Sequence, residues 1–181
     1  MAWNEPHGNT SMIAWWYMHD GMGIGLSQRK FILEIILEAG LSGCKPAIIL
    51  VEHNRKLTTH EYDMISSLSI DDPLLKDSSA YQRLVGKLIY LTMTRPNICY
   101  VVQILSQFMH SLKQFHMNVT LKVVKYLKGC LGLGIFLSWE CKKKMTSFCD
   151  TYYATCQMTR RSIIGFCIKL GDLLISWKMK K

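Results

Sequence analysis

Apolar side chains recur at helical spacing through the middle of the chain, from Ser78 to Gly129. The first group, at positions i, i+3, i+4 and i+7, is Tyr81, Leu84, Val85 and Leu88. Residues at this spacing share one face of a helix. Asp77 and Ser78 stand just before the group, where a short polar side chain can accept hydrogen bonds from the unpaired N–H groups of the first turn. The pattern therefore predicts an amphipathic helix with its N-cap at one of these two residues.

A second helical pattern opens at Arg95-Pro96. Proline suits a first turn because its missing N–H has no helical partner there in any case. The apolar positions that follow are Ile98, Val101, Val102, Leu105, Phe108 and Met109. They keep the helical period throughout, so we expect the strongest helix of the chain here.

A third pattern divides into an apolar arc and a basic arc. The apolar arc consists of His116, Val119, Thr120, Val123 and Leu127, and the opposite arc carries Lys122, Lys125 and Lys128. Gly129 follows, and glycine is the residue that most readily ends a helix in the left-handed conformation. The spacing predicts a helix with one buried face and one basic face, capped at Gly129.

The chain before these helices contains one more helical pattern and one apolar run. Ser27 is placed as the N-cap of a helix that contains Phe31 and Ile35 and ends at Gly40. Residues 47–51 are apolar and have the length of a strand. We therefore expect a helix and then a short extended segment.

Two stretches show no period that predicts a helix or a strand. Residues 52–77 are polar and are predicted to be a linker rather than a folded element. Residues 1–22 are rich in Trp, Met and His. Their aromatic cluster, Trp15-Trp16-Tyr17, is either a platform for stacking bases or a hydrophobic edge, and we favour the edge.

Beyond the third helix the spacing changes from helical to alternating. Leu133, Ile135, Leu137 and Trp139 lie on one face of a predicted strand. Three more strands are predicted at residues 145–154, 162–170 and 173–178, the last two joined by a hairpin at Gly171-Asp172. Together the elements predict an α+β fold, with a helical segment followed by an antiparallel sheet.

Residues 81–109, YQRLVGKLIYLTMTRPNICYVVQILSQFM, are followed by His116 and then by Tyr-Leu-Lys-Gly at residues 126–129. This run resembles the segment between reverse transcriptase and RNase H in the Pol polyproteins of copia-type LTR retrotransposons. Residues 23–47, GIGLSQRKFILEIILEAGLSGCKPA, resemble the end of that family's polymerase domain. Residues 148–181 resemble the opening of its RNase H domain. The motifs are long and nearly gapless, which makes the resemblance specific.

The resemblance implies a division of the chain. Residues 1–22 are unmatched, and the other parts are the end of reverse transcriptase (23–52), the linker (53–77), the helical connection (78–140) and the start of RNase H (141–181). In the family, RNase H begins with three antiparallel strands and continues with a helix and two parallel strands. The resemblance therefore implies a helical connection segment followed by a truncated antiparallel RNase H-like sheet.

Composition adds limits on compartment and partner. With 49% apolar and 19% charged residues, the 181-residue chain is globular rather than disordered, and its net charge of +9 favours a polyanionic partner such as nucleic acid. The seven cysteines are odd in number and contain no C-x-x-C pair, which favours reduced thiols over disulfides or a zinc site. No apolar run approaches the ~18 residues of a membrane span, and no basic region resembles the start of a signal peptide. We expect an intracellular protein, cytoplasmic or nuclear, without a membrane partner.

Polymerisation in the family needs an aromatic-x-Asp-Asp hairpin whose carboxylates hold two magnesium ions. The chain instead has Ile70-Asp71-Asp72-Pro73, which lies downstream of the Ser-Gln-Arg-Lys segment at residues 27–30 rather than upstream. No aromatic residue precedes the two aspartates, and Pro73 cannot sit within a following ladder strand. We interpret the motif as a turn and a cap.

The family's first RNase H carboxylate lies in an Asp-Ala-Asp-Trp-Ala motif, which here reads Asp150-Thr151-Tyr152-Tyr153-Ala154. Asp150 matches, whereas Tyr152 replaces the second aspartate. RNase H cleavage needs about four carboxylates around two metals, and a lone carboxylate binds Mg²⁺ weakly because the ion keeps most of its water. We interpret Asp150 as a vestigial and weak metal position. No cofactor is expected for this chain, although the intact family uses magnesium.

A set of basic residues is available for nucleic-acid contact: Lys122, Lys125, Lys128, Lys142, Lys143, Lys144, Arg160 and Arg161. In a whole polyprotein these lysines would face a template–primer duplex, since phosphate contacts need cations and read no bases. For the chain alone we favour the solvated face that any amphipathic helix has. The two arginines match a Thr-Arg-Arg-Ser loop of the family, which is either a solvated hairpin loop or a phosphate contact.

The sequence is thus interpreted as a truncated, catalytically inactive fragment of a copia-type reverse transcriptase/RNase H polyprotein, a transposable-element product that lacks the rest of Pol. The alternative is a co-opted protein that binds RNA or DNA backbone weakly and without sequence preference. A working polymerase or RNase H would need carboxylates that the motifs above do not supply.

Overall fold

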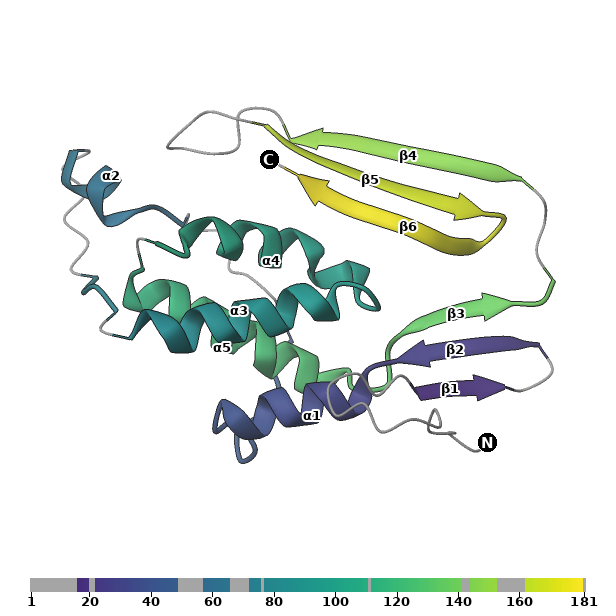
Figure 1. Ribbon diagram of the computed structural model, residues 1–181, viewed down its shortest axis with the longest axis horizontal. Coiled ribbons are helices and arrows are strands. Elements are labelled where there is room, and N and C mark those ends of the chain that lie inside the picture. Colours follow the sequence, from purple (N-terminus) through teal and green to yellow (C-terminus); the bar gives the residue numbers. More distant parts are fainter. Residues whose placement is uncertain are drawn as a thin grey trace.

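The structure, a computed structural model, describes residues 16–19, 22–48, 57–65, 72–75, 77–110, 112–140, 144–152 and 162–180. The helices form one body, with two three-stranded antiparallel sheets beside it (Figure 1). The helices are α1 (Arg29–Glu38), α2 (His60–Ile65), α3 (Ser78–Leu91), α4 (Cys99–Leu105) and α5 (Gln114–Gly129). The strands are β1 (Trp16–His19), β2 (Gly23–Ser27), β3 (Ile135–Ser138), β4 (Met145–Tyr152), β5 (Ile163–Leu170) and β6 (Leu173–Lys180). The predicted α+β class is confirmed.

The core lies among α1, α3, α4 and α5, and two of its helices follow the predicted pattern. In α3, Tyr81, Val85 and Leu88 are fully buried, and Asp77 caps the helix by accepting hydrogen bonds from the N–H groups of its first turn. The apolar arc predicted for α5 is buried as well: His116, Val119, Thr120, Val123 and Leu127. Each buried aliphatic side chain contributes roughly 1.5–3 kcal/mol relative to an exposed one. The stripes of these helices therefore supply much of the stability of the helical body.

The second helical pattern forms a shorter and less regular element than expected. It consists of a 3-10 turn at Pro96–Ile98, the seven-residue α4, and a second 3-10 turn at Ser106–Phe108. The expectation of the strongest helix is wrong, because α3 has 14 residues and α5 has 16. No side chain caps α4, and its β-branched valines and isoleucine lower helix propensity.

Helix α1 begins later than predicted, because Ser27 belongs to a strand. Ser27 is the last residue of β2 and pairs with Trp16 of β1. The N-cap position is Gln28, whose side chain makes no capping hydrogen bond. The N-cap role predicted for Ser27 is therefore wrong, since its backbone is held by the sheet.

The two glycines expected to end helices behave differently. Gly40 has a φ of 67°, and beyond it the N–H of Leu41 bonds back to the carbonyl of Ile36 at 2.9 Å. This is the usual geometry of a glycine-capped helix end, so the predicted end of α1 is confirmed. Gly129 is not among the described glycines with positive φ, and the left-handed cap predicted there is wrong. A Cβ on Gly129 would lie 3.2 Å from the Cβ of Pro46, so glycine lets the segment after α1 pass close to α5.

The segment predicted to be an unfolded linker contains folded and buried parts. Helix α2 lies within it, and the Asp63 side chain on this helix is buried. Farther on, the N–H of Leu75 donates to the carbonyl of Leu112 at 3.0 Å, and the carboxylate of Asp72 accepts from the N–H of Phe115 at 3.1 Å. The expectation of a linker without a folded element is wrong for this described part. Polar composition concealed it, because the contacts are made by backbone and charged groups.

The first sheet has the order β1-β2-β3 and joins the two ends of the described helical region. Strand β3 confirms the strand predicted within residues 133–139, but it pairs with β2, with Leu26 opposite Ile135. Strand β1 was not predicted, and the side chains of the aromatic cluster lie outside the described structure. Of the strand predicted at residues 47–51, residues 47 and 48 lie in no strand, and the others are not among the described residues.

The second sheet has the order β4-β5-β6 and confirms the three consecutive antiparallel strands predicted from the sequence. Gly171, with a φ of 59°, forms the tight hairpin between β5 and β6. Figure 1 places β6 along the helical body and β4 on the far side of the sheet.

In the described part of the chain, none of the helices has the length and apolar character needed to cross a bilayer.

Candidate functional site

Asp150, which matches the family's first RNase H carboxylate, lies on β4 and is exposed. Its neighbour across the sheet on β5 is Gly165, which in turn lies opposite Met179 of β6. Phe148, two residues before Asp150, shares its face of the sheet because side chains alternate along a strand. The Lys169 ammonium lies 5.9 Å from the centre of the Phe148 ring. The carboxylate therefore stands beside Gly165, with the aromatic ring of Phe148 and the thioether of Met179 on the same face of the sheet.

A groove of about 630 Å³ runs between this face of the sheet and the helical body. Pro96, Cys99 and Tyr100 line it from the helices, and Phe148 and Trp177 are among the residues that line it from the sheet. Asp150 supplies the one carboxylate among the described residues that line the groove. The groove is thus mainly aromatic and sulfur-bearing.

The surroundings of Asp150 offer little to a hard metal ion. Mg²⁺ prefers six oxygen ligands, whereas Gly165 has no side chain and Met179 offers a soft thioether. Within the described ranges, no three His, Cys, Asp or Glu side chains gather closely enough to hold a metal. The backbone of Tyr152 belongs to β4, and its side chain lies outside the described structure. Asp150 therefore contributes a single oxygen-bearing group.

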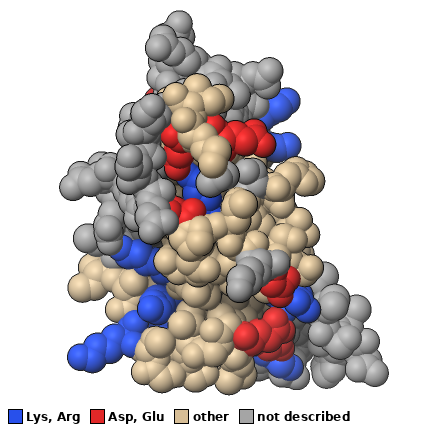
Figure 2. Space-filling view, turned by 90° about the vertical axis from the view of Figure 1, so that its left-hand side faces the viewer, with Lys and Arg blue, Asp and Glu red and all other residues tan. Residues whose placement is uncertain are grey.

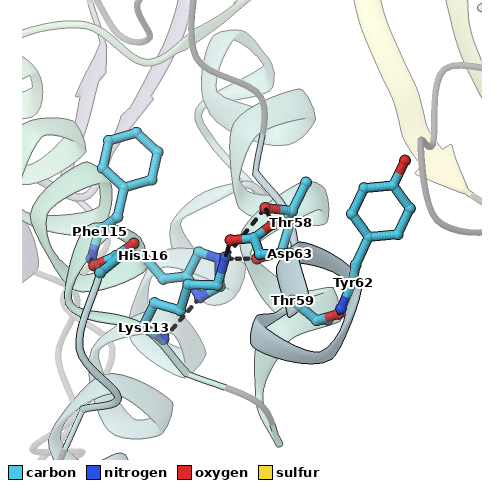
Figure 3. A network of polar contacts seen from close by, with 8 residues as sticks. Thr58, Thr59, Tyr62, Asp63, Lys113, Phe115 and His116 are labelled. Atoms are coloured by element: carbon cyan, nitrogen blue, oxygen red, sulfur yellow. Dashed lines mark hydrogen bonds and ion pairs between the residues drawn. The ribbon is translucent and has the colours of Figure 1, made fainter. Parts of the chain in front are cut away.

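A buried polar network joins α2 to the start of α5 (Figure 3). The Lys113 ammonium forms an ion pair with Asp63 and donates to Thr58 Oγ1 at 3.1 Å, and Thr58 Oγ1 donates to Asp63 at 2.6 Å. All three residues are buried, with at most 6% of each exposed. Each charge therefore depends on the other, because a buried charge without a partner is strongly destabilising.

His116 extends this network on α5. Its Nδ1 accepts the backbone N–H of Lys113 at 3.2 Å, so the proton of the neutral ring lies on Nε2, which donates to the Thr58 carbonyl at 3.2 Å. The ring stacks on Phe108 with 4.3 Å between centroids. Burial, assisted by the charge of Lys113, lowers the pKa of His116 to about 4. The imidazole is therefore neutral near pH 7.

Arg95 is a second buried cation, only 1% exposed. Its guanidinium donates to the carbonyl of Cys130 and, at 3.6 Å, to the sulfur of the same residue. Burial lowers the pKa of Arg95, and the nearby Cys130 raises it in part. The contact fixes the turn before the first 3-10 segment against the end of α5. Like Lys113, Arg95 positions elements, and neither residue lies on the face that carries Asp150.

Three known proteins are similar to the chain over the same share of its length. It is 35% identical over 161 residues to the uncharacterized mitochondrial protein AtMg00810 of Arabidopsis thaliana. The aligned residues cover 88% of this chain and 62% of that protein. It is 32% identical over 159 residues to the retrovirus-related Pol polyprotein from transposon RE1 of Arabidopsis thaliana, 88% of this chain and 10% of that protein. For the corresponding polyprotein from transposon RE2 of the same plant, identity is 33% over 159 residues, with the same coverage. The chain belongs to the copia-type retrotransposon Pol family.

The chain spans less than two thirds of the mitochondrial relative and a small part of the copia-type polyproteins. No family model matches it, and no solved structure does. The copia-type resemblance predicted from residues 23–47 and 81–109 is confirmed by these relatives. The likeness of β4, β5 and β6 to the first strands of RNase H rests on the sequence resemblance and on strand order.

The basic arc that the copia-type resemblance places toward nucleic acid is partly engaged within the chain. The Lys128 ammonium donates to backbone carbonyls of the loop after α1, to that of Leu41 at 3.1 Å and that of Cys44 at 2.8 Å, and also to that of Ser42. Those bonds hold its head group against the loop, although the residue stays partly exposed. Lys122 and Lys125 are half-buried on the same helix.

The remaining basic candidates of this copia-type chain are spread over other elements. Lys144 is exposed directly before β4, which belongs to the sheet that lies farthest from α5 (Figure 1). Lys142, Lys143, Arg160 and Arg161 lie outside the described residues. Figure 2 shows another face of the molecule, on which basic and acidic side chains are both scattered over neutral surface. Among the described residues drawn there, no continuous basic patch forms.

Proposed function

We propose that the chain is the part of a copia-type Pol polyprotein that connects reverse transcriptase to RNase H, and that it has neither polymerase nor nuclease activity of its own. The observation that carries this proposal is the setting of Asp150, a lone carboxylate among the described residues of its groove. Two-metal phosphoryl chemistry needs several carboxylates that converge on two ions. One exposed carboxylate beside Gly165 and Met179 does not provide that arrangement.

The Asp-Asp-Pro motif supports the same proposal from the polymerase side. Asp72 accepts a hydrogen bond from the backbone N–H of Phe115, in the first turn of α5. A carboxylate at a helix N-terminus satisfies unpaired donors and is favoured by the helix dipole. Asp72 thus bonds to a helix 43 residues later in the sequence rather than within a local turn, and Asp71 lies outside the described residues. The carboxylate of Asp72 thus has a structural partner in place of a metal.

Boundaries follow from the same proposal. Strands β4, β5 and β6 would be the opening antiparallel strands of RNase H, and the helices between α3 and α5 would be the connection. Their order along the chain and the antiparallel pairing of β4 with β5 and of β5 with β6 support this assignment. Residues 23–52 would then close the polymerase domain.

Two assays test the proposed lack of activity. The purified chain is incubated with a primed RNA template and nucleotides, and separately with an RNA–DNA hybrid, each with magnesium and then with manganese. We expect extension and cleavage no greater than those of an Asp150→Asn variant prepared in the same way. Cleavage that disappears in the Asp150→Asn variant would overturn the proposal, because it would show that Asp150 works with ligands not recognised here.

A second candidate function is weak binding to the RNA or DNA backbone. The net charge of +9 and the exposed lysines of the second sheet, Lys144, Lys178 and Lys180, favour it. Affinity supplied by phosphate contacts alone falls steeply with salt and does not depend on sequence. Anisotropy of labelled duplexes of different sequence, titrated across KCl concentrations, measures both properties. A sequence preference that persists at high salt would rule out binding through phosphates alone.

A further inference from the structure

The segment of residues 57–65, which carries α2, makes few apolar contacts with the helical body. Met64 and Ile65, at the end of α2, are 71% and 85% exposed. Among the described side chains of α2, only that of Asp63 is buried. Leu57, before the helix, is partly buried against the core. A segment that buries so little apolar surface depends on its polar contacts to stay in place.

Those polar contacts converge on Lys113 and His116, at the start of α5 (Figure 3). The Lys113 ammonium binds the carboxylate of Asp63 and the hydroxyl of Thr58. The His116 ring donates from Nε2 to the carbonyl of Thr58 and accepts the backbone N–H of Lys113 at Nδ1. The imidazole therefore links the segment to α5 only while one of its nitrogens carries a proton and the other does not.

A second proton on this ring would break the arrangement. A doubly protonated imidazole donates from both nitrogens, so Nδ1 would meet the Lys113 N–H donor to donor. The ring would also gain a positive charge in a buried site where Lys113, Asp63 and Asp72 are the charged groups that act on it. Both carboxylates already have partners, and the stacked neighbour of the ring, Phe108, is uncharged. The added charge would thus be poorly compensated.

We propose that residues 57–65 form a latch that opens in acid: a proton taken up by His116 releases the segment while the rest of the helical body stays folded. The stretch that follows α2 is held separately. The N–H of Leu75 donates to the carbonyl of Leu112 at 3.0 Å, and the N–H of Gln114 donates to the carbonyl of Pro73 at 2.9 Å. Backbone amides do not titrate in this range, so residues 73–75 stay bound when the latch opens.

The pH range of opening follows from the environment of the ring in the two states. Burial, assisted by the charge of Lys113, lowers the pKa of His116 to about 4 in the closed state, and solvation returns it to the ordinary value of 6.5 in the open state. The open state therefore takes up the proton first. The stabilisation of the closed state is complete above pH 6.5 and is lost as pH falls toward 4. From pH 7.5 to pH 5 the equilibrium constant for opening should rise about 30-fold. The latch does not depend on the proposed function.

Hydrogen exchange of the full chain, followed by mass spectrometry of peptides from α2 and α3, tests the latch. Rates measured from pH 7.5 to pH 5 are corrected for the intrinsic pH dependence of exchange. We expect the α2 amides to be less protected than those of α3 at every pH, because α2 opens without the core. Their protection should fall about 30-fold over this range.

Two substitutions of histidine by glutamine locate the proton. In His116→Gln the side-chain amide can accept from Lys113 and donate to Thr58 without titrating, so α2 should stay protected and lose its pH response. His110→Gln, at an exposed imidazole, should leave the response unchanged. The double variant Asp63→Leu/Lys113→Met removes the ion pair and should keep most of the response, since burial is the larger cause of the lowered pKa of His116.

Three results would each overturn the latch. One is protection of α2 that does not change with pH after the correction. Another is a His116→Gln variant that responds to pH as the unmodified chain does, because the proton would then bind elsewhere in the network. The third is equal protection of α2 and α3 at every pH, which would show that the segment opens only when the whole helical body unfolds.

Discussion

The indole N–H of Trp177 donates to the backbone carbonyl of Thr92 at 2.8 Å. Trp177 lies on β6 and Thr92 follows α3 as its C-cap residue, so this bond ties the second sheet to the helical body. The Cys99 sulfur lies 3.9 Å from the same carbonyl, and burial raises the pKa of the Cys99 thiol. A partly buried indole needs such an acceptor, since its N–H would otherwise lose its water without replacement.

Replacing Trp177 with Phe should lower the free energy of unfolding by about 1 kcal/mol, because the Thr92 carbonyl loses its strongest donor, the indole N–H, while the aromatic packing is largely kept. Urea unfolding followed by circular dichroism measures the change. Trp139→Phe is the matched control, since Trp139 is 55% exposed and its replacement should stay within about 0.5 kcal/mol. Equal effects of the two substitutions would contradict docking of the sheet through Trp177.

The ion pair between Lys113 and Asp63 should be far more costly to break than to remove. Asp63→Leu leaves a buried ammonium without its partner and should lower the free energy of unfolding by about 3–5 kcal/mol. The double variant Asp63→Leu/Lys113→Met replaces both charges with apolar groups and should recover most of that loss. Chemical unfolding of Asp63→Leu, of Lys113→Met and of the double variant measures the coupling. Additive single effects would mean that α2 is not held by this pair.

Folding stability should fall as pH drops below 6.5 because of His116. The pKa of the folded ring is about 4, below the ordinary value of 6.5, so the unfolded chain takes up a proton over this range and the folded chain does not. Stability from this group is complete above pH 6.5 and is lost progressively toward pH 4, by roughly 3 kcal/mol. Urea unfolding at several pH values should show a flatter profile for His116→Gln than for His110→Gln, whose imidazole is exposed. Identical profiles would contradict a buried neutral ring.

The parts of the fold that the sequence predicted well are those determined by local pattern. The apolar stripe of α3, the cap at Asp77 and the three strands of the second sheet all depend on residues within a few positions of one another. The first sheet could not be predicted in this way, because β3 pairs with β2 across more than a hundred residues. Local pattern also failed where backbone contacts decide the conformation, as at Gly129, where the chain around Pro46 passes close by.

The same limit applies to the candidate site. Asp150 could be predicted because a short motif contains it. The structure places it on the predicted strand, β4, which says nothing of a metal-binding role. The network of Thr58, Asp63 and Lys113 carries no motif, since Lys113 lies 55 residues from Thr58 and 50 residues from Asp63 in sequence. One signal was present: a histidine, His116, on the apolar arc of α5 requires buried partners. The sequence thus indicates that His116 has a hydrogen-bond partner, but it does not indicate which residue the partner is.

A pair of identical substitutions tests the joint between β2 and β3. A Cβ on Gly134 would fall well inside contact distance of the Leu26 carbonyl oxygen, a backbone atom that cannot move aside cheaply. Gly134→Ala should therefore lower the free energy of unfolding by about 1–3 kcal/mol and weaken the protection of the β2 amides in hydrogen exchange. Gly86→Ala, in the middle of α3 with open space around it, should raise stability by about 0.5–1 kcal/mol, because alanine favours the helix. The same chemical change thus has opposite signs at two sites. If Gly134→Ala is as stable as Gly86→Ala, β3 does not lie against β2 in solution, and the first sheet does not join the two ends of the helical region.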